Sequence, residues 1–279
     1  MTETEKKAVG RYLDWHTGIL LETDGKMGIY RKESGKLIYK EKADSEDGYL
    51  GMYLFLMGKY LEKTENTDLP EYWKKGISLA LKKIQSLMRD GITQVSEENT
   101  TAYLMDNLEV WKGLHELELA GLEDTQEISE MRKKIQAQIE NIFWDDANQR
   151  WRIIGNSDLY DQTEFYPDGV AQIYPLIYEF PVKEKKKQKI LYDQFTEKFQ
   201  WQKLNKKRNG FLWAMTGMAA VQMGDIDNLV ELIGNYETEY GENRKYPLYT
   251  GEAGWICMEC EKLYRLYERK IKTGFILCA

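Results

Sequence analysis

The helical segments of this chain alternate between two kinds, and this alternation restricts the fold more than any other feature. One kind is amphipathic. In residues 71–90, Trp73, Ile77 and Ile84 fall on one stripe at steps of three and four residues. Segments of this kind also lie at 6–22, 127–143, 183–199 and 225–240.

Segments of the other kind are apolar or small on nearly all sides, which is typical of a buried helix. They lie at 47–61, 101–119, 168–180, 209–223 and 251–267. A single-layer bundle does not explain buried helices that alternate with amphipathic ones. Two concentric layers do, so the sequence predicts an all-α fold, an (α/α) toroid of about five to six helical hairpins.

Two segments depart from the helical pattern and predict short β-hairpins. Residues 26–42 place apolar pairs on both sides of Glu33-Ser34-Gly35, and residues 142–154 have the same form around Asp145-Asp146. No segment has the composition of a long linker, so the sequence predicts a single domain that spans residues 1–279.

Charge and cysteine content narrow the class of protein. The net charge of −7 argues against nucleic acid as a partner, and no run of 18 apolar residues predicts a membrane span. The polar opening MTETEKKAVG is unlike a secretory leader, so the cytoplasm is the expected location. Cys257 and Cys260, with His16 and His115, are the residue types of a zinc site, but simple packing is the preferred interpretation. No cofactor and no metal are predicted, and the oligomeric state stays open.

Acidic residues stand at the start of most of the apolar segments. If those helices run parallel, their starts gather at one end and surround one concavity. The candidate catalytic residues are Glu46, Asp47, Asp106 and Asp168. The alternative is that each carboxylate only caps its helix, and Asp106 with Glu109 has the spacing of a capping box.

Aromatic and polar residues near the same starts are candidates for substrate binding, because aromatic rings with polar edges suit sugars. They are Tyr49, Tyr103, Asn107, Trp111, Tyr166, Trp213, Glu252 and Trp255. A pair of carboxylates in an aromatic-lined cleft is what glycoside cleavage requires.

Three segments resemble the six-hairpin glycosidase superfamily, and in particular a group of uncharacterised bacterial members. They are residues 44–49 (DSEDGY), 103–114 (YLMDNLEVWKGL) and 166–175 (YPDGVAQIYP). Ser45-Glu46 also partly resembles the Ser-Glu-Gly opening of glycoside hydrolase family 8, in which the Glu is the general acid, although Asp47 stands where that motif has Gly. The resemblance implies a toroid acting on polysaccharides or oligosaccharides.

The leading hypothesis is therefore a glycoside hydrolase acting on a small oligosaccharide or polysaccharide fragment. Asp47, or its neighbour Glu46, is the expected proton donor, Asp106 the base or its partner, and Asp168 a third carboxylate. The rival hypothesis is a non-catalytic toroid that binds a carbohydrate or a protein. A third is a scaffold in which the carboxylates only cap helices.

Overall fold

The computed structural model describes residues 1–65, 69–122, 125–155, 157, 164–204, 213–242 and 249–276. Contacts group the chain into two compact units, Met1–Asp158 (unit 1) and Leu159–Ala279 (unit 2). The single domain expected from the sequence stays a prediction.

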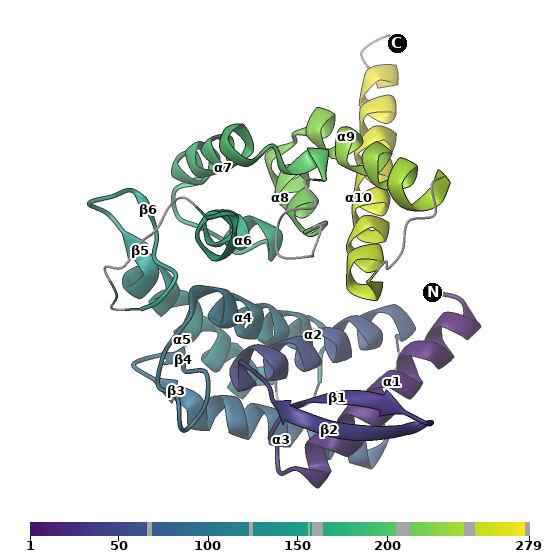
Figure 1. The fold of residues 1–279 in the computed structure, drawn as a ribbon, viewed down its shortest axis with the longest axis vertical. Helices are drawn as coiled ribbons and strands as arrows, with labels where there is room; N and C mark the ends of the chain where they lie inside the picture. The colour runs from purple at the N-terminus through teal and green to yellow at the C-terminus, as the bar shows by residue number, and fades with distance from the viewer. Residues whose placement is uncertain are drawn as a thin grey trace. The chain divides into compact units, whose positions relative to one another are not determined.

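The described part of the chain is mostly helical, with ten α-helices and three two-stranded sheets (Figure 1). Unit 1 holds α1 (Glu3–Glu22), β1 (Gly28–Glu33), β2 (Lys36–Lys42), α2 (Glu46–Thr64), α3 (Glu71–Leu87), β3 (Met88–Arg89), β4 (Ile92–Thr93), α4 (Leu104–Leu119), α5 (Thr125–Phe143), β5 (Trp144–Asp145) and β6 (Arg150–Trp151). Unit 2 holds a π-helical turn η1 (Phe165–Gly169), α6 (Val170–Ile177), α7 (Lys185–Phe199), η2 (Trp201–Lys203), α8 (Thr216–Met223), α9 (Ile226–Tyr236), η3 (Glu237–Glu242) and α10 (Thr250–Ile276). The all-α class is confirmed. None of these helices is both long and apolar enough to cross a membrane.

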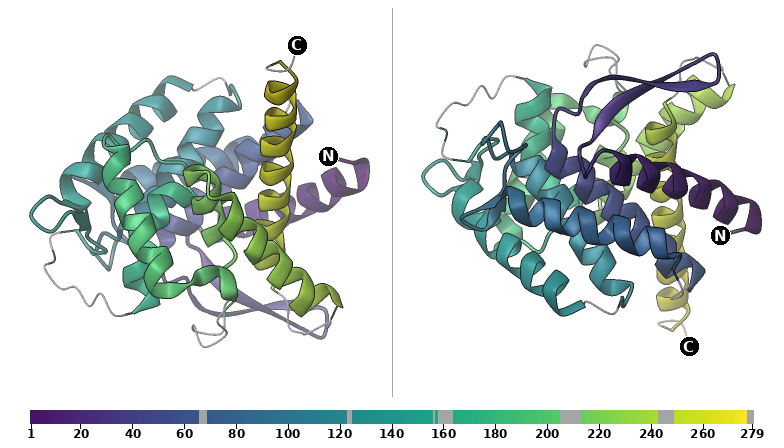
Figure 2. Two further views of the ribbon diagram at one scale, coloured as in Figure 1. Left: turned by 90° about the horizontal axis from the view of Figure 1, so that it is seen from above. Right: turned by 90° about the horizontal axis from the view of Figure 1, so that it is seen from below.

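Helices α2 and α4 form the centre of unit 1 and lie side by side in parallel (Figures 1 and 2). Glycines set their spacing. A Cβ on Gly51 would lie 2.7 Å from the Val110 nitrogen, and one on Gly58 would lie 2.6 Å from the Glu116 carbonyl carbon. A Cβ on Gly113 would collide with the Gly51 carbonyl oxygen. Gly51 and Gly58 of α2 therefore meet Val110 and Glu116 of α4 in the same chain order. The two helices run parallel, so their N-termini lie at the same end.

The amphipathic helices α1, α3 and α5 cover this central pair. In α3 the predicted stripe is buried, with Ile84 at 0% exposure. Helix α1 is joined to α2 by a buried hydrogen bond of 2.9 Å between the Thr17 and Tyr53 hydroxyls. In unit 1 the predicted alternation of buried and covering helices is therefore confirmed.

Both predicted hairpins are present. Strands β1 and β2 pair antiparallel, and the Tyr30 ring packs edge-on against Trp15 of α1 at 6.2 Å. Strands β5 and β6 form a second, shorter pair. A third hairpin, β3–β4, was not expected, and it turns at Asp90-Gly91, where both residues have positive φ. That dipeptide is a strong hairpin signal that the sequence interpretation passed over.

In unit 2 the prediction of a buried helix holds for α6, whose residues 173–177 are all buried. The same prediction is wrong for residues 251–267. Among residues 250–268 of α10, only Glu252 and Glu259 are buried, while Tyr264 is 64% exposed. The apolar residues of this segment are interleaved with charged ones, so they do not make a helix that is apolar on all sides. Asn209, the predicted start of the fourth buried helix, lies outside the described residues, and α8 begins at Thr216.

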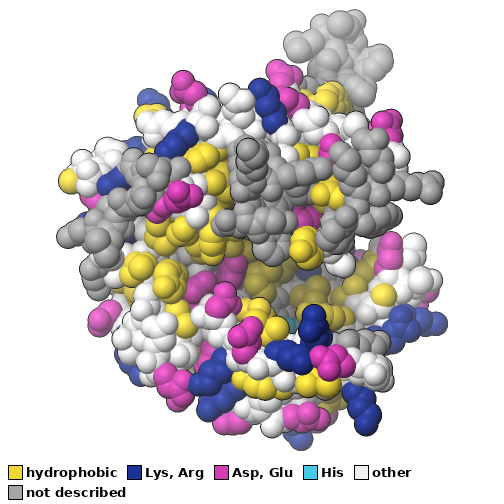
Figure 3. All heavy atoms as spheres, in the orientation of Figure 1, with side chains coloured by type: hydrophobic (Ala, Val, Ile, Leu, Met, Phe, Trp, Pro, Cys, Tyr) yellow, Lys and Arg dark blue, Asp and Glu magenta, His cyan; other side chains and the backbone are white. Residues whose placement is uncertain are grey.

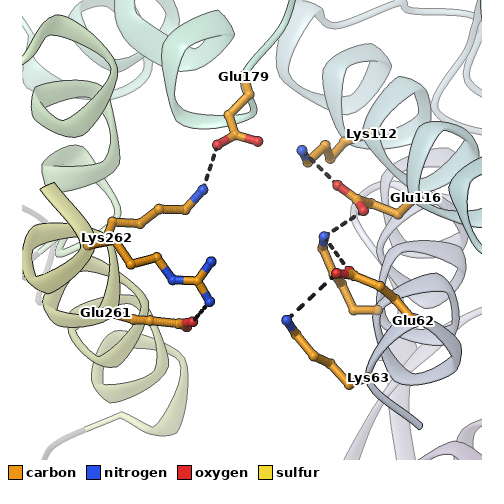
Figure 4. Close-up of polar contacts among 9 residues, drawn as sticks. Glu62, Lys63, Lys112, Glu116, Glu179, Glu261 and Lys262 are labelled. Carbon is orange, nitrogen blue, oxygen red and sulfur yellow. Dashed lines mark hydrogen bonds and ion pairs between the residues drawn. The ribbon is translucent and has the colours of Figure 1, made fainter. Parts of the chain in front are cut away.

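Charged side chains of both signs intermingle on the face drawn in Figure 3. Within unit 1, Lys112 and Lys59 both pair with the buried carboxylate of Glu116, at 2.8 and 2.6 Å, and Lys59 also reaches Glu62 (Figure 4). Within unit 2, Lys262 of α10 pairs with Glu179 at 3.1 Å. The first of these groups joins α2 to α4 at the end opposite their shared starts.

Candidate functional site

The shared N-terminal end of α2 and α4 brings together the acidic cluster, which we define as Ser45, Asp47, Thr93, Asp106 and Glu109. Ser45 is the N-cap of α2, and its hydroxyl accepts from the Gly48 amide at 3.1 Å. The same hydroxyl donates to Asp47 Oδ1 at 2.8 Å. A Cβ on Gly48 would lie 2.7 Å from Glu109 Oε2 and 3.4 Å from Asp106 Oδ1. The carboxyl groups of α4 therefore lie over the first turn of α2.

Asp47 is fully buried, and hydroxyl groups hold both of its carboxylate oxygens. The Thr93 hydroxyl of β4 donates to Asp47 Oδ2 at 2.6 Å, while the Ser45 hydroxyl donates to the other oxygen, Oδ1. Asn107 fixes Thr93 in turn, because its Oδ1 accepts from the Thr93 amide at 2.7 Å and its Nδ2 donates to the Thr93 carbonyl at 3.0 Å. Burial raises the pKa of Asp47, and the two hydroxyl donors oppose that rise because they stabilise the charged form. Asp47 is thus a buried residue that a ligand does not reach.

Asp106 lies beside Asp47 and is partly exposed. Its pKa is raised from 3.8 to about 8, first by burial and then by the negative charges of Asp47 and Glu109. A helix N-terminus favours a charged carboxylate, so burial and like charge outweigh the helix dipole here. The raised pKa favours the protonated form of Asp106, and part of its surface reaches solvent.

The capping-box interpretation of Asp106 and Glu109 is wrong. The N-cap of α4 is Tyr103, which makes no side-chain cap bond, and Asp106 is the third residue of the helix. For α2 the capping side chain is Ser45 rather than Asp47 or Glu46.

The other predicted site residues of unit 1 differ in how far their side chains are exposed to solvent. Tyr49 is 38% exposed, and its pKa is raised by burial and by nearby charges that include Glu109, so its ring lies close to the acidic cluster. Glu46 is half-buried, and burial raises its pKa. Tyr103 is half-buried and bridges to Ile154.

Trp111 and Asn107 lie in the interior of unit 1. Trp111 is 2% exposed, and its indole N–H donates to Gln136 of α5 at 3.2 Å. Asn107 is 0% exposed and serves the Thr93 contacts described above. The structure places both in the packing around α4, without a surface that a ligand would reach.

Unit 2 carries the remaining candidates as a separate group. The Tyr166 ring is 40% exposed and packs on Trp213 at 4.7 Å. Glu252 of α10 accepts from the Ala214 amide at 2.8 Å and so holds the segment that carries Trp213. Asp168 lies in η1, half-buried, two residues after Tyr166. The Trp255 ring lies edge-on to Tyr178, with ring centroids 6.2 Å apart.

Sequence reasoning did not single out Thr93 and Glu259. Thr93 follows the Asp90-Gly91 turn, so the hairpin signal would have placed it on a strand, but not against Asp47. Glu259 is 0% exposed, and its carboxylate oxygens have no hydrogen-bond partner among the described residues. Its pKa is raised well above 4.5 by burial and by the charge of Glu252. Only the fold reveals this, because a glutamate in a charged helical segment normally faces solvent.

Histidine and cysteine positions also differ from a zinc site. Within the described ranges, no three His, Cys, Asp or Glu side chains group as metal ligands would. Cys257 and Cys260 are exposed on α10, so the packing interpretation is wrong for them. His16 is buried against Tyr53, with ring centroids 5.0 Å apart, and burial lowers its pKa to about 4.

The chain matches no family model, and the search of curated proteins found no match.

Proposed function

We propose that this chain is a glycoside hydrolase-like (α/α) toroid that acts on a small oligosaccharide, with Asp106 as the proton donor. The observation that carries the proposal is that Asp106 is partly exposed and lies with Glu109 over the first turn of α2, where burial and the charge of Asp47 raise its pKa. A general acid needs a proton at working pH and access to the leaving oxygen, and the raised pKa and partial exposure of Asp106 suit both needs.

The roles expected from the sequence change in this proposal: Asp106 becomes the proton donor, and the base is Glu109. Asp47 was the expected donor, but full burial and two hydroxyl partners keep it from a substrate. Its proposed function is to lie beside Asp106, where its negative charge raises the pKa of Asp106. Glu109, one helical turn after Asp106 and partly exposed, is the second carboxylate that activates water. Tyr49 supplies an exposed ring beside them.

The toroid is the arrangement that the alternation of helices supports, with α2 and α4 as neighbouring members of the inner ring. The cytoplasm stays the expected location.

The proposal is tested by incubating the wild-type chain with a panel of chromogenic glycosides and with unmodified oligosaccharides, and measuring product. The Asp106→Asn and Glu109→Gln variants are each expected to lose about 10²–10⁴-fold in kcat. Asp227→Asn is the matched control, because Asp227 also lies in the first turn of a helix, α9, but is exposed. Turnover that survives Asp106→Asn would remove the proposed acid.

A second candidate is a toroid that binds a carbohydrate or a protein without cleaving it. The observation in its favour is that Asp47, the proton donor expected from the sequence, is buried and bonded to two hydroxyls, while the Tyr49 ring nearby stays exposed. Calorimetry on the same oligosaccharide panel separates the two candidates. Binding without product in the wild type supports the second candidate.

A further inference from the structure

Unit 1 contains an open hollow of about 230 Å³ that none of the predicted site residues lines. It lies among the β3–β4 hairpin, the segment before α4 and the chain after β6. Ile92, Ile142 and Ile154 contribute apolar side chains to its lining, which is polar for the larger part. Ile92 is only 6% exposed, so it belongs to the core of unit 1.

The more exposed side chains of the lining, which we call the rim, are polar. Arg89 Nη1 donates to the main-chain oxygens of Ser86 and Met88, at 2.8 Å each, which fixes the guanidinium. Its other N–H groups bond to no described residue, and the same holds for the side chains of Gln94, Thr100 and Thr101. The rim therefore offers a guanidinium, an amide and two hydroxyls, all without protein partners in the described part of the chain.

We propose that this hollow binds a single sugar ring. A pyranose has an apolar face of C–H groups that can contact the isoleucine side chains of the lining, and its hydroxyls both donate and accept, as the amide and hydroxyls of the rim do. Arg89 and Asp90 place one charge of each sign on the rim, which fits a neutral ligand. The volume is below the roughly 300–1,000 Å³ of pockets that hold drug-sized ligands, so the hollow fits one ring rather than a chain.

The hollow is connected to the acidic cluster through β4. Ile92 and Thr93 are consecutive in this strand, and neighbouring strand residues point to opposite faces. Ile92 faces the hollow, and Thr93 donates to Asp47. A sugar bound on Ile92 therefore contacts the strand that holds Asp47. The choice of a sugar as ligand rests in part on the proposed function, whereas the existence of the site does not.

The test is a methyl NMR titration of the full chain labelled at isoleucine δ1-methyl groups. The probes are methyl β-glucoside, methyl β-xyloside and glycerol. Saturable shifts are expected for Ile92, Ile142 and Ile154 with a glycoside, and none for Ile77, which is buried in α3. Thr101→Val keeps the side-chain shape and removes one hydroxyl, so it should weaken binding by about threefold to tenfold.

Thr4→Val is the control, since Thr4 is an exposed threonine of α1 outside the hollow, and it should leave the titration unchanged. The proposal is overturned if the three methyl groups do not shift with either glycoside. It is also overturned if glycerol saturates them at the same concentration, or if Thr101→Val has no effect. The titration is repeated in Asp106→Asn, which separates this site from the proposed hydrolase: lost turnover with retained shifts leaves the hollow as a sugar site.

Discussion

Replacing Asp106 with asparagine should stabilise the protein at neutral pH. Asparagine keeps the shape of the side chain and is neutral in the folded and the unfolded chain, so it needs no proton uptake on folding beside Asp47 and Glu109. The pKa of Asp106 is about 8 in the folded chain against 3.8 ordinarily, so folding holds a proton that the unfolded chain releases. At any pH above 3.8 this proton uptake lowers the free energy of unfolding of the wild-type chain.

The size of this cost follows from the same values. About three pH units separate 3.8 from pH 7, at about 1.4 kcal/mol each, which gives a ceiling of about 4 kcal/mol. Asp106 is partly solvated and shares its titration with Asp47, so we expect about half of the ceiling, ~2 kcal/mol. Because the folded-state pKa is raised, the favourable proton binding is fully present below pH 3.8 and is lost as pH rises to about 8.

Urea unfolding of the wild type and Asp106→Asn at several pH values measures this difference. The variant should gain stability over the wild type as pH rises from 4 to 8, and the two should converge near pH 3.5. Asp227→Asn, the exposed first-turn control, should change by less than about 1 kcal/mol at every pH. A difference that does not depend on pH, or a less stable Asp106→Asn, would refute the reasoning.

Three further changes test the packing and the buried charges. Gly113→Ala should destabilise unit 1 by about 3 kcal/mol in urea unfolding, because its Cβ collides with the backbone of α2, whereas Gly18→Ala in α1, where the space is open, should cost nothing. Thr93→Val removes a hydroxyl that donates to buried Asp47, so it should cost about 1–3 kcal/mol by the same assay and raise the pKa of Asp47 further. Glu259→Gln should remove a loss of stability that the wild type shows as pH rises above 4.5, since burial raises the pKa of that group; parallel pH curves for the two chains would contradict this.

The sequence predicted the elements of unit 1 well, because helical periodicity records which face of a helix is buried. The patterns of 47–61 and 101–119 correctly indicated α2 and α4. Parallel packing then placed Asp47 and Asp106 at one end, as expected. In α10 the same reasoning failed, because apolar residues mixed with charges do not determine which neighbours will cover a helix.

The roles within the acidic cluster were not accessible from the sequence. Asp47 and Asp106 differ in their exposure to solvent. Asp47 is covered in part by Thr93, which belongs to the β3–β4 hairpin and lies 46 residues from Asp47 along the chain. Trp111 shows the same limit, since its contact with Gln136 of α5 decides that it is buried. Closure of a toroid depends on how many helices assemble, which periodicity within one helix does not encode.

The central claim, that Asp106 is a protonated acid held by the charge of Asp47, is tested most directly by its own titration. The side-chain carboxyl carbon of Asp106 can be followed by ¹³C NMR from pH 4 to pH 9. We predict a midpoint near 8 that moves downward in Asp47→Asn. A midpoint near 4 in the wild-type chain would contradict the claim.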